Sequence, residues 1–258
     1  MRNEEVNLGI VQIRWYSIFI LIAMIIGCFL VYKEATKKGA EKEAIENLLF
    51  YGLLSGILGA RIYYVLFNLD YYLPNFSEVF KVWNGGLAIH GGIIGGLIFF
   101  LIYGKKKKWN ILLLLDTVVI GLFIAQAIGR WGNFFNGEAY GRIITLENLK
   151  RLHIPNFIIE GMYIDGFYRE PTFLYESVFS FLGFLLLLGI RKIPKLRVGQ
   201  LLGCYLIWYG IERGIIETFR SDSLMLGNIK VAQILSLVFI ISGIYFLFKN
   251  IKNNRLYK

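Results

Sequence analysis

The sequence predicts an all-α, polytopic membrane protein with seven transmembrane helices and a small external cap. Hydrophobic residues make up 56% of the 258-residue chain and the mean hydropathy is +0.56, which favours a membrane-embedded chain over a soluble domain. Seven apolar segments each approach the ~20 residues with which a helix crosses a bilayer, and Lys and Arg gather in short stretches between them. We therefore expect residues 1–258 to form a single integral membrane domain.

The seven apolar segments alternate with polar connections along the whole chain. They cover residues 14–32, 47–67, 87–103, 111–130, 172–190, 198–217 and 231–248. An odd number of spans places the two termini on opposite sides of the membrane. The connection formed by residues 131–171 is too long for a simple turn, and we expect it to fold as the external cap.

The basic residues identify the cytoplasmic side. Stretches 33–42, 104–110, 191–197 and 249–258 lie on one side of the predicted spans, and each contains four Lys or Arg, sixteen of the 28 in the chain. This is the positive-inside bias of membrane proteins, so we expect the N-terminus outside and the C-terminus in the cytoplasm. The membrane topology thus explains most of the formal charge of +10. Because the basic residues do not form a surface stripe, no nucleic-acid partner is expected.

Both cysteines lie in apolar segments. The residues that end at Cys28 resemble the lipobox of a lipoprotein signal peptide, which is an alternative interpretation of the N-terminal segment. A similar Gly-Cys pattern recurs at Cys204, where no signal peptide can lie, and Glu4 and Glu5 make the N-terminal region too acidic for one. Small residues in packed helices explain both patterns, and we expect no disulfide scaffold or zinc site.

Ionisable and polar side chains of the apolar segments gather near the predicted outer boundary. An ionisable group within a span costs about 2.5–3.5 kcal/mol on insertion scales, so each is a candidate functional residue. Those within about six residues, or roughly 9 Å, of that boundary are Tyr16, Arg61, His90, Arg130, Glu176, Arg213 and Glu217. Any one alone has a structural explanation, since an arginine such as Arg61 near a helix end can extend to the headgroups. Together, from six helices, they predict a site for a phospholipid headgroup.

The sixth span carries a charged face. Arg213, Glu217 and Arg220 are spaced i, i+4, i+7, which places them on one side of a helix. An ion pair that neutralises itself within the helix is the structural alternative. Even then the second arginine leaves positive charge near the outer surface, which suits a phosphate. The spacing assigns no role to Glu212.

The densest group of polar residues runs from Gly129 to Arg142, with the sequence GRWGNFFNGEAYGR. Here the chain resembles the prolipoprotein diacylglyceryl transferases, whose signature G-R-x-[GA]-N-F-apolar-N-x-E-x-x-G matches residues 129–141 at every specified position. Further similarities lie at Trp15-Tyr16, Gly59 to Ile62, Trp83 to Gly86, His90 to Gly92, Pro171-Thr172, Leu174 to Glu176, Arg213, and Glu217 to Arg220. The chain departs from the family at Glu170 and Phe173, where His and Gln are frequent.

The resemblance implies a transferase that moves the diacylglyceryl group of phosphatidylglycerol onto the lipobox cysteine of prolipoproteins and releases glycerol phosphate. This is the first step of bacterial lipoprotein maturation. Its setting would be the bacterial cytoplasmic (inner) membrane, with the active site facing the outer leaflet of the bilayer. No cofactor is expected, because phosphatidylglycerol already carries the leaving group and the carboxylates have arginine partners rather than metal-ligand spacing.

The resemblance also implies roles for individual residues. A free thiol has a pKa of about 8.5 and needs a base or a positive field. His90 is the expected base, because burial would favour its neutral form; His153 is the weaker candidate, and a hydrogen-bonded residue at a helix start is the structural alternative. Arg130 and Arg213 are expected to clamp the phosphate, with Glu138 beside them in the catalytic set. The remaining expected residues are Asn133, Asn136, Tyr16 and Arg61 for lipid binding, and Glu176, Glu217, Gly141 and Arg220 in support.

Two other functional classes fit some of the same features. Seven spans with glycine-rich helices and polar residues also suit a small-solute or lipid transporter. A transporter site tends to lie at the midplane, whereas these polar residues gather near the outer boundary. A non-catalytic membrane scaffold has no need of the residues at 129–141.

Overall fold

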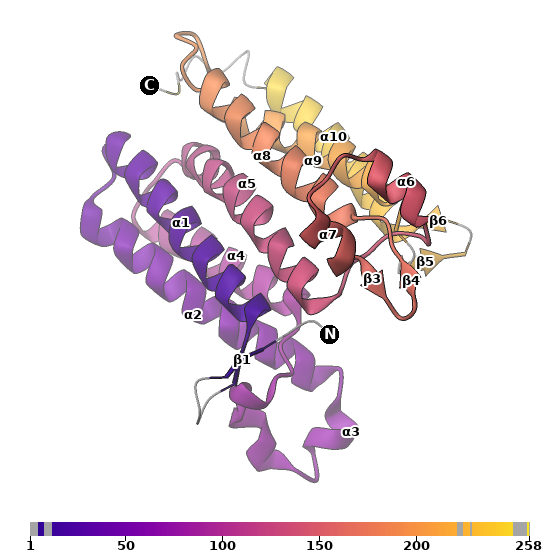
Figure 1. The fold of residues 1–258 in the computed structure, drawn as a ribbon. Helices are drawn as coiled ribbons and strands as arrows, with labels where there is room; N and C mark the ends of the chain where they lie inside the picture. Colours follow the sequence, from indigo (N-terminus) through magenta and orange to yellow (C-terminus); the bar gives the residue numbers. More distant parts are fainter. Residues whose placement is uncertain (1–4, 8–11, 221–223, 228, 250–256, 258) are drawn as a thin grey trace. The chain divides into compact units, whose positions relative to one another are not determined.

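The computed structural model describes residues 5–7, 12–220, 224–227, 229–249 and 257 (Figure 1). The described chain is mainly helical. Its α-helices are α1 Trp15–Lys37, α2 Lys42–Leu66, α3 Leu69–Tyr72, α4 Ile89–Lys106, α5 Ile111–Asn136, α6 Leu146–Arg151, α7 Asn156–Gly161, α8 Thr172–Ile190, α9 Gln200–Ile216 and α10 Val231–Lys249. Short 3-10 helices lie at Phe76–Phe80 and Val82–Asn84, and three antiparallel hairpins pair β1 Glu5–Asn7 with β2 Gln12–Arg14, β3 Tyr163–Ile164 with β4 Phe167–Tyr168, and β5 Met225–Leu226 with β6 Ile229–Lys230.

Every predicted apolar segment corresponds to one long helix, which confirms the all-α class. By length and composition, α1, α2, α5, α8 and α10 are able to cross a membrane. The other two, α4 and α9, have 18 and 17 residues. The structure therefore fits an all-α membrane protein, and the number of seven spans stays a prediction.

The chain divides into two compact units. One comprises residues 1–31 and 115–258, and the other comprises residues 32–114. Helices α1 and α5 each contribute residues to both units. The expected single membrane domain stays a prediction.

In the 32–114 unit, α2 and α4 pack closely because glycines line their contact. A β-carbon added at Gly59 of α2 would lie 2.5 Å from the carbonyl oxygen of Gly91 and 2.9 Å from the Cα of Gly95, both on α4. No side chain fits at such a distance, so Gly59 permits direct contact between the two backbones. Gly91 and Gly95 are thus the residues of α4 at which α2 comes closest.

In the other unit, α9 packs against both α8 and α10 (Figure 1). The start of α9 is fixed by Asp116, a fully buried residue of α5. The N–H groups of Gly199 and Leu202 donate to its carboxylate oxygens at 2.5 and 2.8 Å. Asp116 thus satisfies N–H groups that a helix start leaves without partners, and it fixes the helix that carries Arg213.

Helix α5 continues to Asn136, six residues beyond the predicted apolar segment and into the predicted cap. It continues because its last turns are buried by aromatic contacts. Phe134 is buried and stacks on Phe173 of α8, with ring centroids 4.6 Å apart, and Phe135 stacks on Phe19 of α1 at 5.1 Å. This apolar face keeps the helix intact in spite of Gly132 and the two asparagines.

The rest of the cap consists of α6, α7 and the β3–β4 hairpin, gathered at one end of the helices of this unit (Figure 1). Its buried core contains Leu149, Ile158, Ile159 and Met162 together with Phe134 and Phe173. Asp165 and Gly166 connect the hairpin with φ values of 53° and 82°, as a tight two-residue turn requires. Phe173, one of the two departures from the family pattern, therefore belongs to the core that joins the cap to α5 and α8.

Replacing Asp116 tests its effect on α9. Asp116→Ala leaves two N–H groups at the start of α9 without their acceptor and should lower the free energy of unfolding by about 2–4 kcal/mol. Asp116→Asn keeps one acceptor oxygen and should cost less. Thermal unfolding of the purified protein in detergent measures both. Asp70→Ala, at an exposed aspartate, is the matched control, and an equal midpoint for Asp116→Ala and Asp70→Ala would contradict this role.

Candidate functional site

A buried glutamate near the start of α8 draws three arginines together. Glu176 is 2% exposed. Its Oε1 accepts a hydrogen bond from Nη1 of Arg213 at 2.9 Å and lies 3.8 Å from Nη1 of Arg220. Its Oε2 lies 2.7 Å from Nε of Arg130. A carboxylate is costly to bury without opposite charge, so α5, α9 and the segment after α9 each supply an arginine.

The same group extends along α9 and to the start of α10. Nη2 of Arg213 lies 2.6 Å from Oε2 of Glu217, which is the intrahelical ion pair that the sequence analysis gave as the structural alternative. Nζ of Lys230 donates to the carbonyl oxygens of Glu217 and Arg220 at 2.5 and 3.2 Å. We call Glu176, Glu212, Glu217, Arg130, Arg213, Arg220 and Lys230 the Glu176 cluster. Its four cations and three carboxylates leave one formal positive charge.

The arginines are more accessible than the carboxylates that hold them. Side-chain exposure is 23% for Arg130 and 20% for Arg213, against 2% for Glu176. The contact between Arg130 and Glu176 is an ion pair through Nε without the alignment of a hydrogen bond. Within the described part of the chain, the Nη groups of Arg130 donate to no protein acceptor. An anion that approached the cluster would therefore meet guanidinium groups before carboxylates.

Glu212, to which the sequence assigned no role, is a buried member of the cluster. Its Oε1 accepts a hydrogen bond from Oγ of Ser180 at 2.9 Å. Glu176, Arg130 and Arg213 all lie within electrostatic range of its carboxylate. Through Ser180, Glu212 thus connects α9 to α8.

The last turns of α5 carry the polar residues of the 129–141 motif. Arg130, Asn133 and Asn136 follow one another at intervals of three residues, which places them along one side of the helix. Nδ2 of Asn136 donates to Oε1 of Glu138, and the N–H group of Glu138 donates to the carbonyl oxygen of Asn133 at 3.0 Å. Helix α5 therefore presents the first three of these polar residues, and the turn after it presents Glu138.

Tyr16 lies close to the same turns of α5. A β-carbon added at Gly132 would lie 3.1 Å from Cδ2 of the Tyr16 ring. Arg130 and Glu138 are within electrostatic range of its hydroxyl. The structure therefore places Tyr16, Arg130 and Glu138 in one region of this unit, and their shared role in lipid binding stays a prediction.

Gly141 fixes the segment that follows Glu138. Its N–H group donates to the carbonyl oxygen of Glu170 at 2.9 Å, and it forms a β-bridge with Arg220. A β-carbon at this position would lie 2.8 Å from Cβ of Glu170 and 3.0 Å from the carbonyl oxygen of Phe219. Only glycine fits between these backbones, so Gly141 joins the cap to the segment that carries Arg220.

Glu170, the second departure from the family pattern, has a defined partner. It is buried, and its Oε2 accepts from Nε of Arg142 at 3.0 Å. The two residues also share a backbone bond from the Glu170 N–H group to the Arg142 carbonyl oxygen at 3.0 Å. The pair therefore fastens the segment after Glu138 to the start of α8.

Arg61 lies in the 32–114 unit, where it organises the loop before α4. Its guanidinium carries five N–H groups, and these donate to five backbone carbonyl oxygens, at Val79, Gly85, Gly86, Glu78 and Lys81. The side chain is buried, with the Tyr72 ring 5.1 Å away. Arg61 is therefore a loop anchor in this arrangement, with no N–H group left for a phosphate, and its expected lipid contact stays a prediction.

His90 also belongs to the 32–114 unit, as the second residue of α4. Its ring centroid lies 6.2 Å from that of Tyr63. The side chain is exposed on the protein surface rather than buried within the protein. Its role as a base stays a prediction. His153, the weaker candidate, is exposed in the cap with a φ of 52°.

The sequence missed Lys230 and Ser180. The only signal for Lys230 was a basic residue directly before the last apolar segment, on the side opposite the lysine-rich stretches. Nothing in its spacing marked Ser180 as a partner of Glu212. Among the described residues, no group of three His, Cys, Asp or Glu side chains is arranged to hold a metal ion.

Known proteins are similar to this chain along nearly its whole length. The family model described as "Prolipoprotein diacylglyceryl transferase" matches residues 4–249. Three relatives from Staphylococcus aureus strains MSSA476, MW2 and Newman are each 46% identical over 250 residues, which covers 96% of this chain and 89% of the relative. Each is named phosphatidylglycerol–prolipoprotein diacylglyceryl transferase.

A matched pair of substitutions compares the contribution of the buried Glu176 to stability with that of an exposed glutamate. Glu176→Ala leaves three arginines without their shared carboxylate and should destabilise the protein by about 3–5 kcal/mol. Glu147→Ala removes an ion pair of the same 2.7 Å length to Arg151, but with both side chains over 70% exposed, and should cost less than about 1 kcal/mol. Thermal or denaturant unfolding compares them. Similar losses in the two variants would show that Glu176 does not organise the arginines.

Proposed function

Because the chain belongs to the prolipoprotein diacylglyceryl transferase family, we propose that its transferase reaction takes place at the Glu176 cluster. The reaction moves the diacylglyceryl group of phosphatidylglycerol to the cysteine thiol of a lipobox precursor. The single observation that supports this location of the reaction is the set of contacts that the Arg130 guanidinium makes. Its Nε is held by a buried carboxylate, while its Nη groups donate to no acceptor among the described residues.

The chemistry requires one bond to form and one to break. The cysteine sulfur attacks the glycerol carbon that is bonded to the phosphate oxygen, and a thioether forms as the carbon–oxygen bond breaks. The leaving glycerol phosphate keeps the electron pair of that bond, and the thiol proton passes to a base. Negative charge therefore builds on the phosphate as the bond breaks, and fixed donors near its oxygens lower the barrier.

Arg130 and Arg213 supply those donors. A guanidinium group offers paired N–H groups that match two phosphate oxygens. Glu176 holds both side chains before the substrate arrives, at 2.7 and 2.9 Å, so little reorganisation is needed during the reaction. Glu217 and Arg220 support this arrangement from α9 and the segment after it.

The remaining polar residues of α1 and α5 suit the headgroup. Asn133 and Asn136 provide neutral donors and acceptors for the glycerol hydroxyls of phosphatidylglycerol. Tyr16 lies beside Arg130 and Glu138, where its hydroxyl reaches the same ligand. Glu138 is exposed and is the carboxylate of the motif that is open to substrate.

His90 is the proposed base for the thiol. A free thiol has a pKa of about 8.5, so a neutral imidazole or a positive field has to assist its ionisation. The exposed side chain of His90 is accessible to a peptide. It belongs to the 32–114 unit.

The site faces the outer leaflet in the proposed topology. Seven helices span the bilayer, since α4 and α9, at 18 and 17 residues, reach the lower end of the spanning range of about 17–25 residues. The four lysine- and arginine-rich stretches support a cytoplasmic C-terminus and an external N-terminus. Within its own unit, the Glu176 cluster lies at the start of α8 and the end of α9, the helix ends opposite to the basic stretch 191–197, whereas a transporter site tends to lie at the midplane.

The clamp is tested with labelled phosphatidylglycerol and a lipobox peptide. Wild-type protein should yield thioether product and glycerol phosphate, and none with a Cys→Ser peptide. Arg130→Lys and Arg213→Lys should each lower turnover about 100-fold or more, because Lys cannot bind two phosphate oxygens as Arg does. Arg151→Lys, on an exposed arginine of the cap, should retain activity. Wild-type turnover in both clamp variants would refute the clamp, and absence of product from wild-type protein would refute the function.

The pH dependence of the rate tests His90. An imidazole accepts a proton only when it is neutral, so the wild-type rate should fall as acid protonates it. In His90→Gln, ionisation of the thiol alone limits the reaction, and the rise of kcat/KM should move toward alkaline pH. His153→Gln is the matched control and should keep the wild-type profile. An unchanged profile in His90→Gln would assign the base elsewhere.

A further inference from the structure

The buried carboxylate of Glu212 has no role in the proposed reaction, although it lies close to the arginines that carry it out. Ser180, its hydrogen-bond donor, follows Glu176 by four residues on α8, so these two residues lie one turn apart on the same face of that helix. Glu212 itself directly precedes Arg213 on α9. Its carboxylate therefore lies roughly one helical turn from the contacts of Glu176 with Arg130 and Arg213.

Glu212 differs from the other two carboxylates of the cluster in its contacts. Glu176 lies 2.7 Å from Arg130 and 2.9 Å from Arg213, and Glu217 lies 2.6 Å from Arg213. Glu212 forms no ion pair with any Lys or Arg of the described chain. Its Oε1 has a neutral hydroxyl as donor, and its Oε2 is buried without a donor. A buried carboxylate in such a place readily takes up a proton, because neutralisation removes the cost of burying its charge.

The charged and titratable groups around Glu212 come from the helices that pack near it. They are Arg130 on α5, Glu176 on α8, and Arg213 and Tyr205 on α9. Helix α10 packs against α9 through Ser236, and its Tyr245 and Lys249 lie nine and thirteen residues further along, or about 13 Å or more. The charge that acts on Glu212 is therefore set by the two arginines and Glu176.

We propose that Glu212 binds a proton when a second negative charge develops on an anion at Arg130 and Arg213. The inference rests on the proposed function. A bound anion and the Glu212 carboxylate compete for the same two positive charges, so each is disfavoured by the other until the carboxylate is neutralised. Glu212 is a positioning residue in this account, because it acts on the phosphate through the two arginines.

The charge of the cluster then matches both states of the phosphate. With every carboxylate ionised, four cations and three carboxylates sum to +1, which is opposite to the single charge of the phosphodiester in phosphatidylglycerol. When the carbon–oxygen bond breaks, its electron pair stays on the phosphate, whose charge becomes −2. A proton that Glu212 takes from solvent raises the cluster to +2. The proton returns to solvent when glycerol phosphate leaves.

Protonation also supplies a hydrogen-bond donor to a buried region that needs one. Gln126 precedes Arg130 by one turn of α5, and its Nε2 donates to the Tyr205 hydroxyl at 2.9 Å. The Gln126 Oε1 atom is buried and has no donor within the part of the chain that the structure describes. Tyr205 is also within electrostatic range of Glu212. A proton on Oε2 of Glu212 turns this second buried acceptor into a donor.

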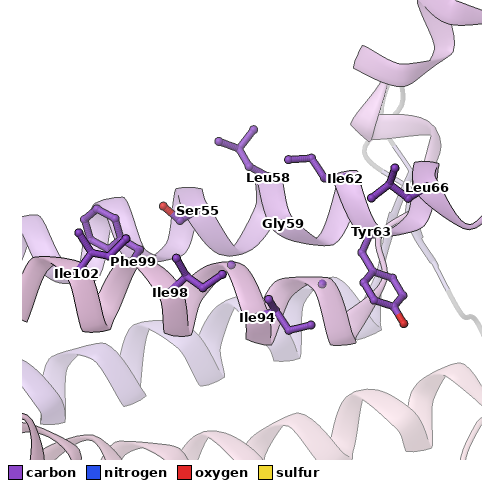
Figure 2. Close-up of a pocket in the computed structure, with 12 residues that line it drawn as sticks. Ser55, Leu58, Gly59, Ile62, Tyr63, Leu66, Ile94, Ile98, Phe99 and Ile102 are labelled. Atoms are coloured by element: carbon purple, nitrogen blue, oxygen red, sulfur yellow. The ribbon is translucent and has the colours of Figure 1, made fainter.

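A cavity in the 32–114 unit provides a contrast. Figure 2 shows it between α2 and α4, with a volume of about 510 Å³ and lining residues that include Leu58, Ile62, Ile94 and Ile98. Its lining contains no Asp, Glu, Lys, Arg or His side chain. An anion finds no cation there, so proton-linked binding of an anion is expected at the Glu176 cluster and not at this cavity.

Infrared difference spectroscopy of the whole protein in phosphatidylcholine vesicles tests proton uptake without requiring turnover. The probe is sulfate, which is a dianion throughout the neutral pH range, so a proton bound on its addition is bound by the protein. Sulfate should produce the C=O band of a protonated carboxylic acid in wild-type protein. The band should be absent in Glu212→Gln and present in Glu34→Gln, at a matched buried glutamate of α1. A band that persists in Glu212→Gln, or no band at any pH at which sulfate binds, would overturn the proposal.

Replacing Ser180 assigns the band in a second way. Its hydroxyl donates to Oε1 of Glu212, and a hydrogen bond to a carbonyl group lowers the stretching frequency of that group. Ser180→Ala should therefore move the band to higher frequency. Ser177→Ala, at a buried serine of α8 that donates to the Ala127 carbonyl oxygen, should leave the band in place. An unmoved band in Ser180→Ala would assign it to another carboxylate, and this test holds if thermal unfolding shows that Glu212→Gln is not folded.

The affinity for sulfate should depend on pH through the same proton. Because at most one proton is bound with each anion, the Kd of wild-type protein should rise by up to about tenfold per pH unit over the range in which Glu212 loses its proton. Titration calorimetry should show that this dependence is lost in Glu212→Gln, retained in Glu34→Gln, and weaker for methyl sulfate, which is a monoanion. The same dependence in wild type and Glu212→Gln, or for both anions, would contradict the proposal.

Failure of the proposed function has a different signature. Wild-type protein that formed no thioether would refute the function, while the sulfate-dependent band would still show whether Glu212 binds a proton. Wild-type protein that did not bind sulfate at all would refute the anion site, and the proposal with it.

Discussion

The buried carboxylate of Glu176 is the constraint on which the site depends. At 2% exposure it has almost no contact with solvent, and an unpaired carboxylate in such a place costs several kcal/mol. The fold meets this requirement with Arg130 from α5, Arg213 from α9 and Arg220 from the segment after α9. The positions of three arginines therefore follow from one glutamate.

The same constraint prepares the arginines for an anion. Guanidinium groups that are held by ion pairs before the substrate arrives need little reorganisation when phosphate charge develops. The surrounding contacts stabilise this state from several directions. Asp116 fixes the start of the helix that carries Arg213, and Gly141 connects the cap to the segment that carries Arg220. Stability and function thus depend on the same side chains.

Much of the helical framework follows from the sequence alone. The hydropathy pattern located all seven long helices, because apolar segments of spanning length have few alternatives in a bilayer. The Arg213–Glu217 pair was also predictable, since residues four apart on a helix are neighbours. The extension of α5 to Asn136 was not, because it depends on stacking between Phe134 and Phe173, which lie far apart in the sequence.

The sequence also could not predict which side chains form ion pairs between helices. Spacing marked Glu176 as unusual, but it did not show that three arginines share this carboxylate. For Arg61 the sequence identified a candidate lipid ligand, whereas the structure shows donors directed at five carbonyl groups of its own loop. The position of a residue within an apolar segment predicts its depth in the membrane. It does not predict which loop contacts that residue. Glu170 and Phe173 similarly acquired roles only through partners in the cap.

The most direct measurement of the central claim is the distance between the lipid phosphorus and the arginine nitrogens. Solid-state NMR of guanidino-¹⁵N-labelled protein in phosphatidylglycerol bilayers detects it as dipolar dephasing between ¹⁵N and ³¹P. The account predicts dephasing at hydrogen-bond range that disappears when Arg130 and Arg213 are both replaced by Lys. No dephasing in the wild-type protein, or undiminished dephasing in the double variant, would contradict it.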